Sequence, residues 1–221
     1  VIFMLSLSDG RQYQSVLDGD SPSFTVPREP DAGEVMLAYP LLGAKHIWEG
    51  PDHLLFVFGL LLLVGGGSRL IWTITAFTLG HSITLALVSL QVFSFPTELA
   101  EFLIALSIFI LAVELSNKTE PGRLWKNPWW LAGAFGLLHG MGFATALAET
   151  GLPQGQVPLA LLFFNIGIEL GQLLFIGLVY LLWFGLGPFI SRSELSLRKV
   201  PLYVLGSLSA MWCIQRGLEI I

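Results

Sequence analysis

The sequence predicts an all-α membrane protein with six transmembrane helices, preceded by a short extracytoplasmic segment of β-like character. Apolar residues make up 54% of the 221 residues and charged residues only 12%, whereas a soluble domain carries about 25% charged residues. From Tyr39 onward the chain contains long apolar stretches, each near the roughly 20 residues that cross a bilayer. Because a spanning segment must satisfy its own backbone hydrogen bonds, such continuous runs predict helices.

The first 37 residues differ from the rest of the chain. Their short strand-like runs are interrupted by turn-forming pairs and prolines, namely Asp9-Gly10, Asp18-Gly19, Pro22, Pro27 and Pro30. This pattern is typical of a small β-rich segment followed by a linker. We therefore divide the chain into an extracytoplasmic segment and linker (residues 1–37) and a six-helix transmembrane domain (residues 38–221).

The charges of the loops predict how the six spans are oriented. The spans are expected at Tyr39–Val64, Leu70–Val92, Thr97–Leu115, Trp129–Ala148, Val157–Leu186 and Val200–Ile220. The loops after spans one, three and five carry seven basic residues: Arg69, Lys118, Arg123, Lys126, Arg192, Arg198 and Lys199. The loops at 93–96 and 149–156 carry none. Basic loops stay in the cytoplasm, so both termini are expected outside it, and Trp125, Trp129 and Trp130 fit an interfacial aromatic belt.

All four histidines of the chain fall inside predicted spans. A lone membrane histidine is explained well by a hydrogen bond between helices. Four histidines together with carboxylates are harder to explain that way, and ionisable residues within spans are functional hypotheses by default. Asp52-His53, His81 and His139 come near mid-membrane, with His46 and Glu101 further out.

Neutral imidazole and carboxylate groups together suit divalent nickel, cobalt, zinc or copper. The single cysteine, Cys213, lies in an apolar stretch, so a soft copper(I) site is not indicated. The expected metal ligands are His46, Asp52, His53, His81, His139 and Glu169. The expected surrounding polar shell is Glu101, Asn165, Gln172 and Ser82, with Asn165, Glu169 and Gln172 on one helical face.

The pair Gly50-Pro51 separates His46 from Asp52-His53. A continuous helix would place His46 and His53 on one face, but proline can kink the helix here. A broken helix beside a polar cluster is common in membrane ion paths.

Several motifs together resemble the HupE/UreJ family. The run from His46 to His53 (His-Ile-Trp-Glu-Gly-Pro-Asp-His) is similar to its first-span His-x5-Asp-His signature. Further matches are Gly80-His81-Ser82, Phe135-Gly-Leu-Leu-His139-Gly140 and Phe164-Asn165-Ile-Gly-Ile-Glu169-Leu-Gly-Gln172. The resemblance implies a six-span bacterial inner-membrane protein with its N-terminus outside, regarded as a nickel or cobalt permease.

One departure from the resemblance concerns span four. Nickel-associated members carry Phe-His-Gly-x-x-His-Gly-x-Glu there. In this chain His139 matches the second histidine, while Phe135 and Gly142 stand in place of the first histidine and the glutamate. The chain resembles the longer branch with an extracytoplasmic N-terminal segment, and the metal is left open among zinc, nickel and cobalt.

Three functions are consistent with these residues. The first is a divalent-metal permease with His46 and Glu101 at its mouth. The second is an intramembrane zinc hydrolase acting on a lipid or membrane peptide, with Asp52 or Glu169 as general base. The third is a metal sensor or assembly protein. The expected partners are the lipid bilayer and a metal ion, with a homo-oligomer or a periplasmic partner of the N-terminal segment left open. The net charge of −5 without a basic stripe speaks against nucleic acid.

Overall fold

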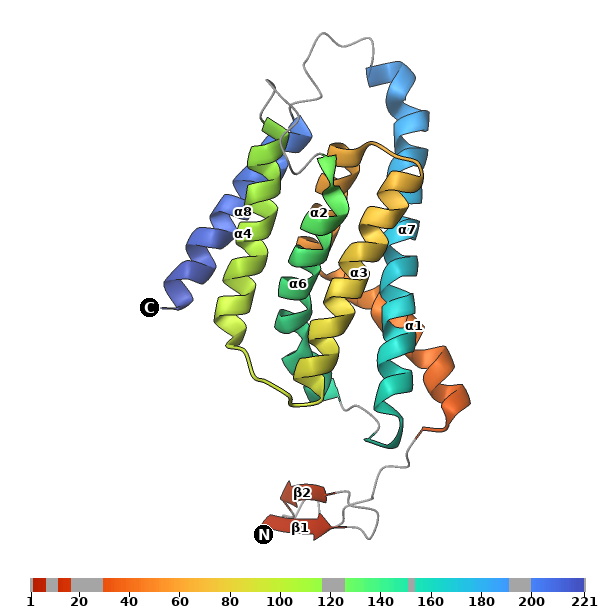
Figure 1. Ribbon diagram of the computed structural model, residues 1–221, viewed down its shortest axis with the longest axis vertical. Helices are drawn as coiled ribbons and strands as arrows, with labels where there is room; N and C mark the ends of the chain where they lie inside the picture. Colours follow the sequence, from red (N-terminus) through yellow and green to blue (C-terminus); the bar gives the residue numbers. More distant parts are fainter. Residues whose placement is uncertain are drawn as a thin grey trace.

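The computed structural model describes the backbone of residues 2–6, 12–16, 30–116, 126–150, 154–190 and 200–220. Side chains are described for residues 30–116, 126–142, 155–185 and 200–220. The chain forms a bundle of helices, with a two-stranded antiparallel sheet of β1 (Ile2–Ser6) and β2 (Gln12–Val16) near the end where the first helix begins (Figure 1). Five of the seven basic residues used to predict the orientation lie outside the described residues: Lys118, Arg123, Arg192, Arg198 and Lys199. Trp125 also lies outside them.

The predicted first span is two helices joined at Gly50. Helix α1 (Ala32–Glu49) begins before the predicted start of the span, because Asp31 and Glu34 form a capping box that satisfies its first turn. Helix α2 (Pro51–Val64) starts with proline at its first position, where the missing N–H is tolerated. The two axes are bent by 79°. The kink expected at Gly50-Pro51 is therefore confirmed, and the continuous helix face is not present.

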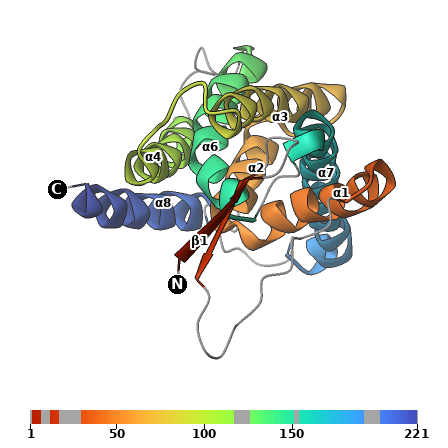
Figure 2. The same cartoon turned by 90° about the horizontal axis from the view of Figure 1, so that it is seen from below.

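The remaining helices run up and down the bundle. They are α3 (Ser68–Ser89), α4 (Thr97–Ser116), α6 (Pro128–Thr150), α7 (Val157–Ile190) and α8 (Val200–Glu219), with a short 3-10 turn η1 (Gln154–Gln156) before α7. Seen from below, α8 lies along α4, α3 along α6, and α1 crosses α7 (Figure 2). The bundle is thus assembled from three close helix pairs around α2.

Glycines allow two of these pairs to pack closely. A Cβ atom at Gly43 of α1 would collide with the carbonyl of Phe164 on α7. A Cβ atom at Gly136 of α6 would likewise collide with the carbonyl of Phe77 on α3. Small residues let helix backbones approach in the membrane, where helix association depends on close packing. Gly140 of α6 is a further close contact, since a Cβ atom there would meet the carbonyl of His81 on α3.

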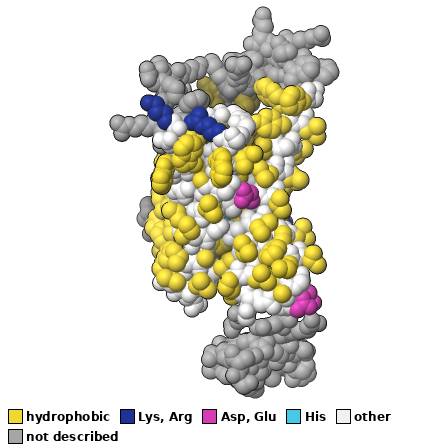
Figure 3. Space-filling model, turned by 45° about the vertical axis from the view of Figure 1, so that its right-hand side comes forward, with side chains coloured by type: hydrophobic (Ala, Val, Ile, Leu, Met, Phe, Trp, Pro, Cys, Tyr) yellow, Lys and Arg dark blue, Asp and Glu magenta, His cyan; other side chains and the backbone are white. Residues whose placement is uncertain are grey.

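The outer surface of the bundle is apolar. Leu37, Trp130 and Phe184 are each more than 70% exposed, and hydrophobic side chains cover most of the face in Figure 3. Three helices, Ser68–Ser89, Thr97–Ser116 and Val157–Gly185, are long and apolar enough to cross a bilayer, and the bent α1–α2 pair passes the same test as a unit. Together with the composition, this identifies a membrane protein. Spans at α6 and α8 stay predictions.

Candidate functional site

The four histidines come together at the break between α1 and α2. His53 is at the centre, with ring centroids 4.4 Å from His46, 6.2 Å from His81 and 5.3 Å from His139. The centroids of His46 and His81 are 6.0 Å apart. We call these four residues the histidine cluster. Its residues come from α1, α2, α3 and α6. His46 and His53 are in contact because the chain bends sharply at Gly50, and not because they share one face of a straight helix.

Local features explain how the rings reach one another. The close α3–α6 contact at Gly140 brings the backbone of His81 against the helix that carries His139. His46 is in the last turn of α1, while His53 is in the first turn of α2. The bend therefore brings His46, placed at the mouth in the permease hypothesis, into the cluster itself.

The cluster is buried, but most of its ring nitrogens lack hydrogen-bond partners among the described residues. His53, His81 and His139 are at most 7% exposed. Among the described side chains, neither ring nitrogen of His53 or of His81 has a hydrogen-bond partner, and Nδ1 of His139 has none. A buried polar atom without a partner destabilises the fold by about 1–3 kcal/mol. So many unsatisfied nitrogens in one place are unusual in a core whose only role is packing.

Ser107 on α4 fixes the tautomer of His139. The Ser107 hydroxyl donates its hydrogen to the carbonyl of Ile104 at 2.7 Å. Because a hydroxyl has only one hydrogen, Ser107 Oγ must accept from His139 Nε2, which lies 3.2 Å away. The proton of the neutral ring is then on Nε2, and Nδ1 presents its lone pair inside the cluster. Ligand histidines in metal sites are commonly oriented in this way by a hydrogen bond to the other nitrogen.

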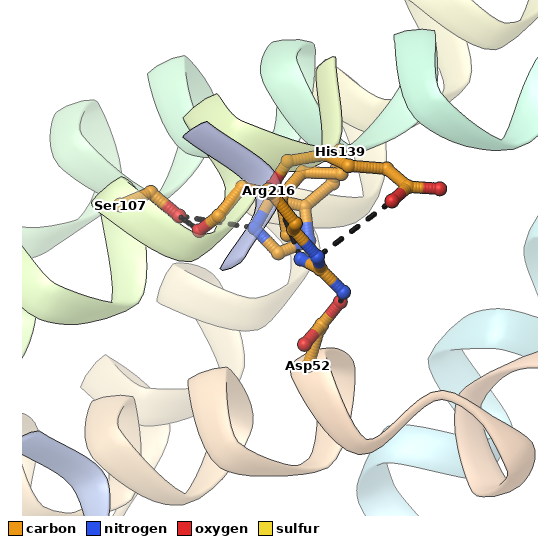
Figure 4. Close-up of polar contacts among 6 residues, drawn as sticks. Asp52, Ser107, His139 and Arg216 are labelled. Carbon is orange, nitrogen blue, oxygen red and sulfur yellow. Dashed lines mark hydrogen bonds and ion pairs between the residues drawn. The ribbon is translucent and has the colours of Figure 1, made fainter. Parts of the chain in front are cut away.

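An ion-pair network adjoins the cluster at Asp52. Nη2 of Arg216 lies 2.7 Å from Asp52 Oδ2, and Nε lies 3.6 Å from Glu101 Oε2. Nη1 also donates to the Glu101 carbonyl at 3.0 Å. Figure 4 shows Arg216 against Asp52, with the Ser107–His139 contact nearby. We call Asp52, Glu101 and Arg216 the ion triad, and its formal charge is −1.

Helix geometry explains the positions of Asp52 and Arg216. Asp52 is in the first turn of α2, where the helix dipole favours a carboxylate. Arg216 extends the stripe of α8 residues that includes Leu205, Ser209 and Trp212, spaced four and three apart along the face towards α4. The guanidinium also lies 5.5 Å from the centre of the Trp212 ring, a favourable arrangement for a cation over an aromatic face.

Other predicted site residues lie along the contact between α3 and α7. Thr75 Oγ1 donates to Glu169 Oε1 at 2.6 Å, and Thr78 donates to Gln172 Oε1 at 3.1 Å. Asn165 donates to the Leu161 carbonyl. On α3 itself, Ser82 donates to the Thr78 carbonyl. Glu169 as a metal ligand stays a prediction, since its described hydrogen bond is to Thr75.

Sequence reasoning missed Arg216, Ser107 and Thr75. The signal for Arg216 was present, because it is a basic residue within the last predicted span and such residues are functional hypotheses. Ser107 and Thr75 resemble the many hydroxyls that bond their own helix backbone. Their roles depend on which helix lies opposite, and spacing within one helix does not contain that information.

The spacing of the imidazole rings can be compared with the spacing of histidines on a bound metal. In the part of the chain whose side chains are described, no three His, Cys, Asp or Glu groups converge closely enough to hold an ion as they stand. With metal–nitrogen bonds of about 2.0–2.1 Å, two imidazoles on one tetrahedral ion have ring centroids roughly 5 Å apart. The observed separations of 4.4–6.2 Å bracket this value. By chemical type, imidazole nitrogens suit zinc, nickel or cobalt, but the rings would have to rotate from the positions they hold here before three of them could contact one ion.

Comparison with known proteins identifies the family. No curated protein and no solved structure matches the chain. A sequence model described as HupE / UreJ protein matches residues 23–216, which include the histidine cluster and all three residues of the ion triad. The match covers most of the chain, and the chain therefore belongs to the HupE/UreJ family.

Proposed function

We propose that the protein is a divalent-metal permease that binds nickel, cobalt or zinc at the histidine cluster. The observation that carries this proposal is the convergence of four histidines from four helices into one buried group. The unpartnered nitrogens of His53, His81 and His139 are the donor atoms available to an ion. The metal is the transported substrate, and Asp52 and Glu169 are proposed additional ligands. Membership of the HupE/UreJ family supports the same function, because the resemblance to that family implies a nickel or cobalt permease.

Asp52 and Glu169 are the proposed source of negative charge for the ion. Burying a divalent cation in the membrane without counter-charge is strongly unfavourable, because its hydration is lost. Asp52 is adjacent to His53, and Glu169 lies half-buried on α7 against Thr75. Imidazole nitrogens with carboxylate oxygens are a donor set suited to these metals.

We propose that the protein lies in the bacterial inner membrane with both termini outside the cytoplasm. Arg69 and Lys126 belong to loops predicted to be cytoplasmic, and they meet at one end of the bundle, where Arg69 donates to the Lys126 carbonyl at 3.1 Å. Basic side chains gather at one end of the molecule in Figure 3. Trp129 and Trp130 at the start of α6 are exposed beside them, as expected of an interfacial belt.

The experiment that tests this function measures metal binding and movement on the same protein. The chain would be purified without a metal-affinity tag and its bound metal determined by mass spectrometry. We expect about one ion per chain for the wild type, and loss of the ion in His53→Ala and His139→Ala. Cys213→Ala is the control, because its thiol is outside the cluster and should leave binding unchanged.

Transport is then measured in sealed proteoliposomes. The wild type should carry nickel, cobalt or zinc to the opposite side, while His53→Ala should not. A wild type that binds no metal at micromolar concentration would overturn the proposal. A wild type that holds one ion tightly but moves none would favour the hydrolase, whose metal stays in place.

A further inference from the structure

In the ion triad, the positively charged guanidinium of Arg216 pairs with the carboxylate of Asp52, which is next to His53 of the histidine cluster. Asp52 and Arg216 side chains are 15% and 16% exposed, whereas His53 beside them is 7% exposed. The pair is therefore more accessible from the surface than the His53 ring next to it in the sequence. Asp52 Oδ2 is taken by Arg216, while its Oδ1 is buried without a hydrogen-bond partner among the described residues. The carboxylate is therefore only half satisfied.

Arg216 has a second carboxylate within reach. Glu101 is 44% exposed, its Oε2 lies 3.6 Å from Nε of Arg216, and its backbone carbonyl already accepts from Nη1. If the bond to Asp52 breaks, the guanidinium keeps these two contacts to Glu101. Leaving a buried charge unpaired is strongly unfavourable. This arrangement lets Arg216 release Asp52 without becoming an unpaired charge.

We propose that Arg216 is a built-in competitor of the metal ion for Asp52. In the ion-free protein Arg216 neutralises Asp52. An arriving divalent cation displaces the guanidinium from Asp52, and Arg216 then pairs with Glu101 alone. No covalent bond changes; one cation replaces another at the carboxylate. This inference rests on the proposed permease function and adds a residue that sets its affinity and times access to the cluster.

The test compares Zn²⁺ binding by calorimetry in purified, detergent-solubilised protein. Arg216→Gln removes the competing charge, so Zn²⁺ should bind about tenfold more tightly than to the wild type. Arg216→Lys keeps the charge but loses the guanidinium fork that contacts Asp52 and Glu101 together, so its Zn²⁺ affinity should lie between those of the wild type and Arg216→Gln. Lys45→Gln is the matched control, because it removes one positive charge from an exposed i,i+4 pair with Glu49 and should change binding little.

A double variant ties the effect to Asp52. In an Asp52→Asn background the gain from Arg216→Gln should disappear, because the contested carboxylate is gone. Trp212 gives a second measurement, since Arg216 lies over its ring. Zn²⁺ is redox-inactive and does not itself quench tryptophan by electron transfer. A Zn²⁺-dependent change in tryptophan emission that is lost in Trp212→Phe would therefore report that the guanidinium has moved away from the ring.

The outcomes separate this inference from the function on which it rests. If the wild type binds no Zn²⁺, Ni²⁺ or Co²⁺, the proposed function is wrong and the competitor role with it. If the wild type binds but folded Arg216→Gln binds equally or more weakly, only the competitor role is overturned. Should Arg216→Gln fail to fold, the emission decides: a wild type that binds Zn²⁺ with no Trp212-dependent change also overturns it.

Discussion

Two neighbouring layers of the bundle share helices α2, α3 and α6 but differ in how their buried side chains are satisfied. In the histidine cluster, α2, α3 and α6 supply His53, His81 and His139. About one turn closer to the end that carries Arg69 and Lys126, the same helices supply Phe56, Phe77 and Phe135. The Phe56 and Phe77 centroids are 4.9 Å apart, and each is 5.1 Å from His139. We call these three phenylalanines the aromatic layer.

The difference shows how one bundle can hold a stable packed layer next to a polar candidate metal site. The aromatic layer satisfies itself through dispersion and ring contacts and needs no hydrogen bonds. The histidine cluster is equally buried but leaves ring nitrogens unsatisfied. An ion that leaves the cluster towards the basic end must pass the aromatic layer, so in a permease that layer has to move. A substitution in the aromatic layer should therefore change mainly the stability, and one in the histidine cluster mainly the binding of metal.

The largest expected effect comes from the aromatic layer. Phe77→Ala removes a ring that is 1% exposed and should lower the free energy of unfolding by about 3–5 kcal/mol. Zn²⁺ affinity should change far less, because no ligand is lost. Equilibrium unfolding in mixed detergent micelles measures the first quantity and calorimetry the second. Loss of Zn²⁺ binding in a folded variant would mean that the two layers are not separate.

A substitution in the histidine cluster should do the reverse. His81→Phe replaces a fully buried ring by a ring of related shape and removes two unsatisfied nitrogens. The free energy of unfolding should rise by about 1–3 kcal/mol, because unsatisfied buried polar atoms are unfavourable. Metal binding should fall sharply. If instead the variant is clearly less stable and metal content is unchanged, His81 is a packing residue.

The smallest expected effect concerns the hydrogen bond that orients His139. Ser107→Ala removes the acceptor of the Nε2 proton, so Zn²⁺ affinity should fall by about tenfold. Ser107→Thr retains the hydroxyl and should keep affinity near that of the wild type. Calorimetry on both variants checks the prediction. Equal affinity in Ser107→Ala and the wild type would show that the tautomer of His139 is set by another contact.

The fold was predictable where the signal lies within one segment. Long apolar runs predict helices wherever they occur, and the Gly50-Pro51 break follows from the missing N–H of proline. The beginning of α1 was placed too late, because the Asp31–Glu34 capping box extends the helix into polar sequence. Helix ends are set by such side-chain contacts as well as by hydropathy.

The candidate residues were predictable by type but only partly by arrangement. His46, Asp52, His53, His81 and His139 stand out because ionisable groups in spans are rare. Nothing in their spacing places Arg216 on Asp52, since residues 164 positions apart meet only through the packing of α8 on α4 and of α4 on α2. The rotation of each helix about its own axis decides such pairs.

The sequence by itself determined a helical membrane protein, a broken helix at Gly50-Pro51 and a set of ionisable residues in the HupE/UreJ pattern. These features depend on local hydropathy, backbone chemistry and residue type. Only the tertiary structure decided that the 79° bend brings His46 onto His53, that Ser107 directs His139, and that Arg216 pairs with Asp52. Contacts between helices depend on close backbone approach and on helix rotation, and neither is a property of any single segment.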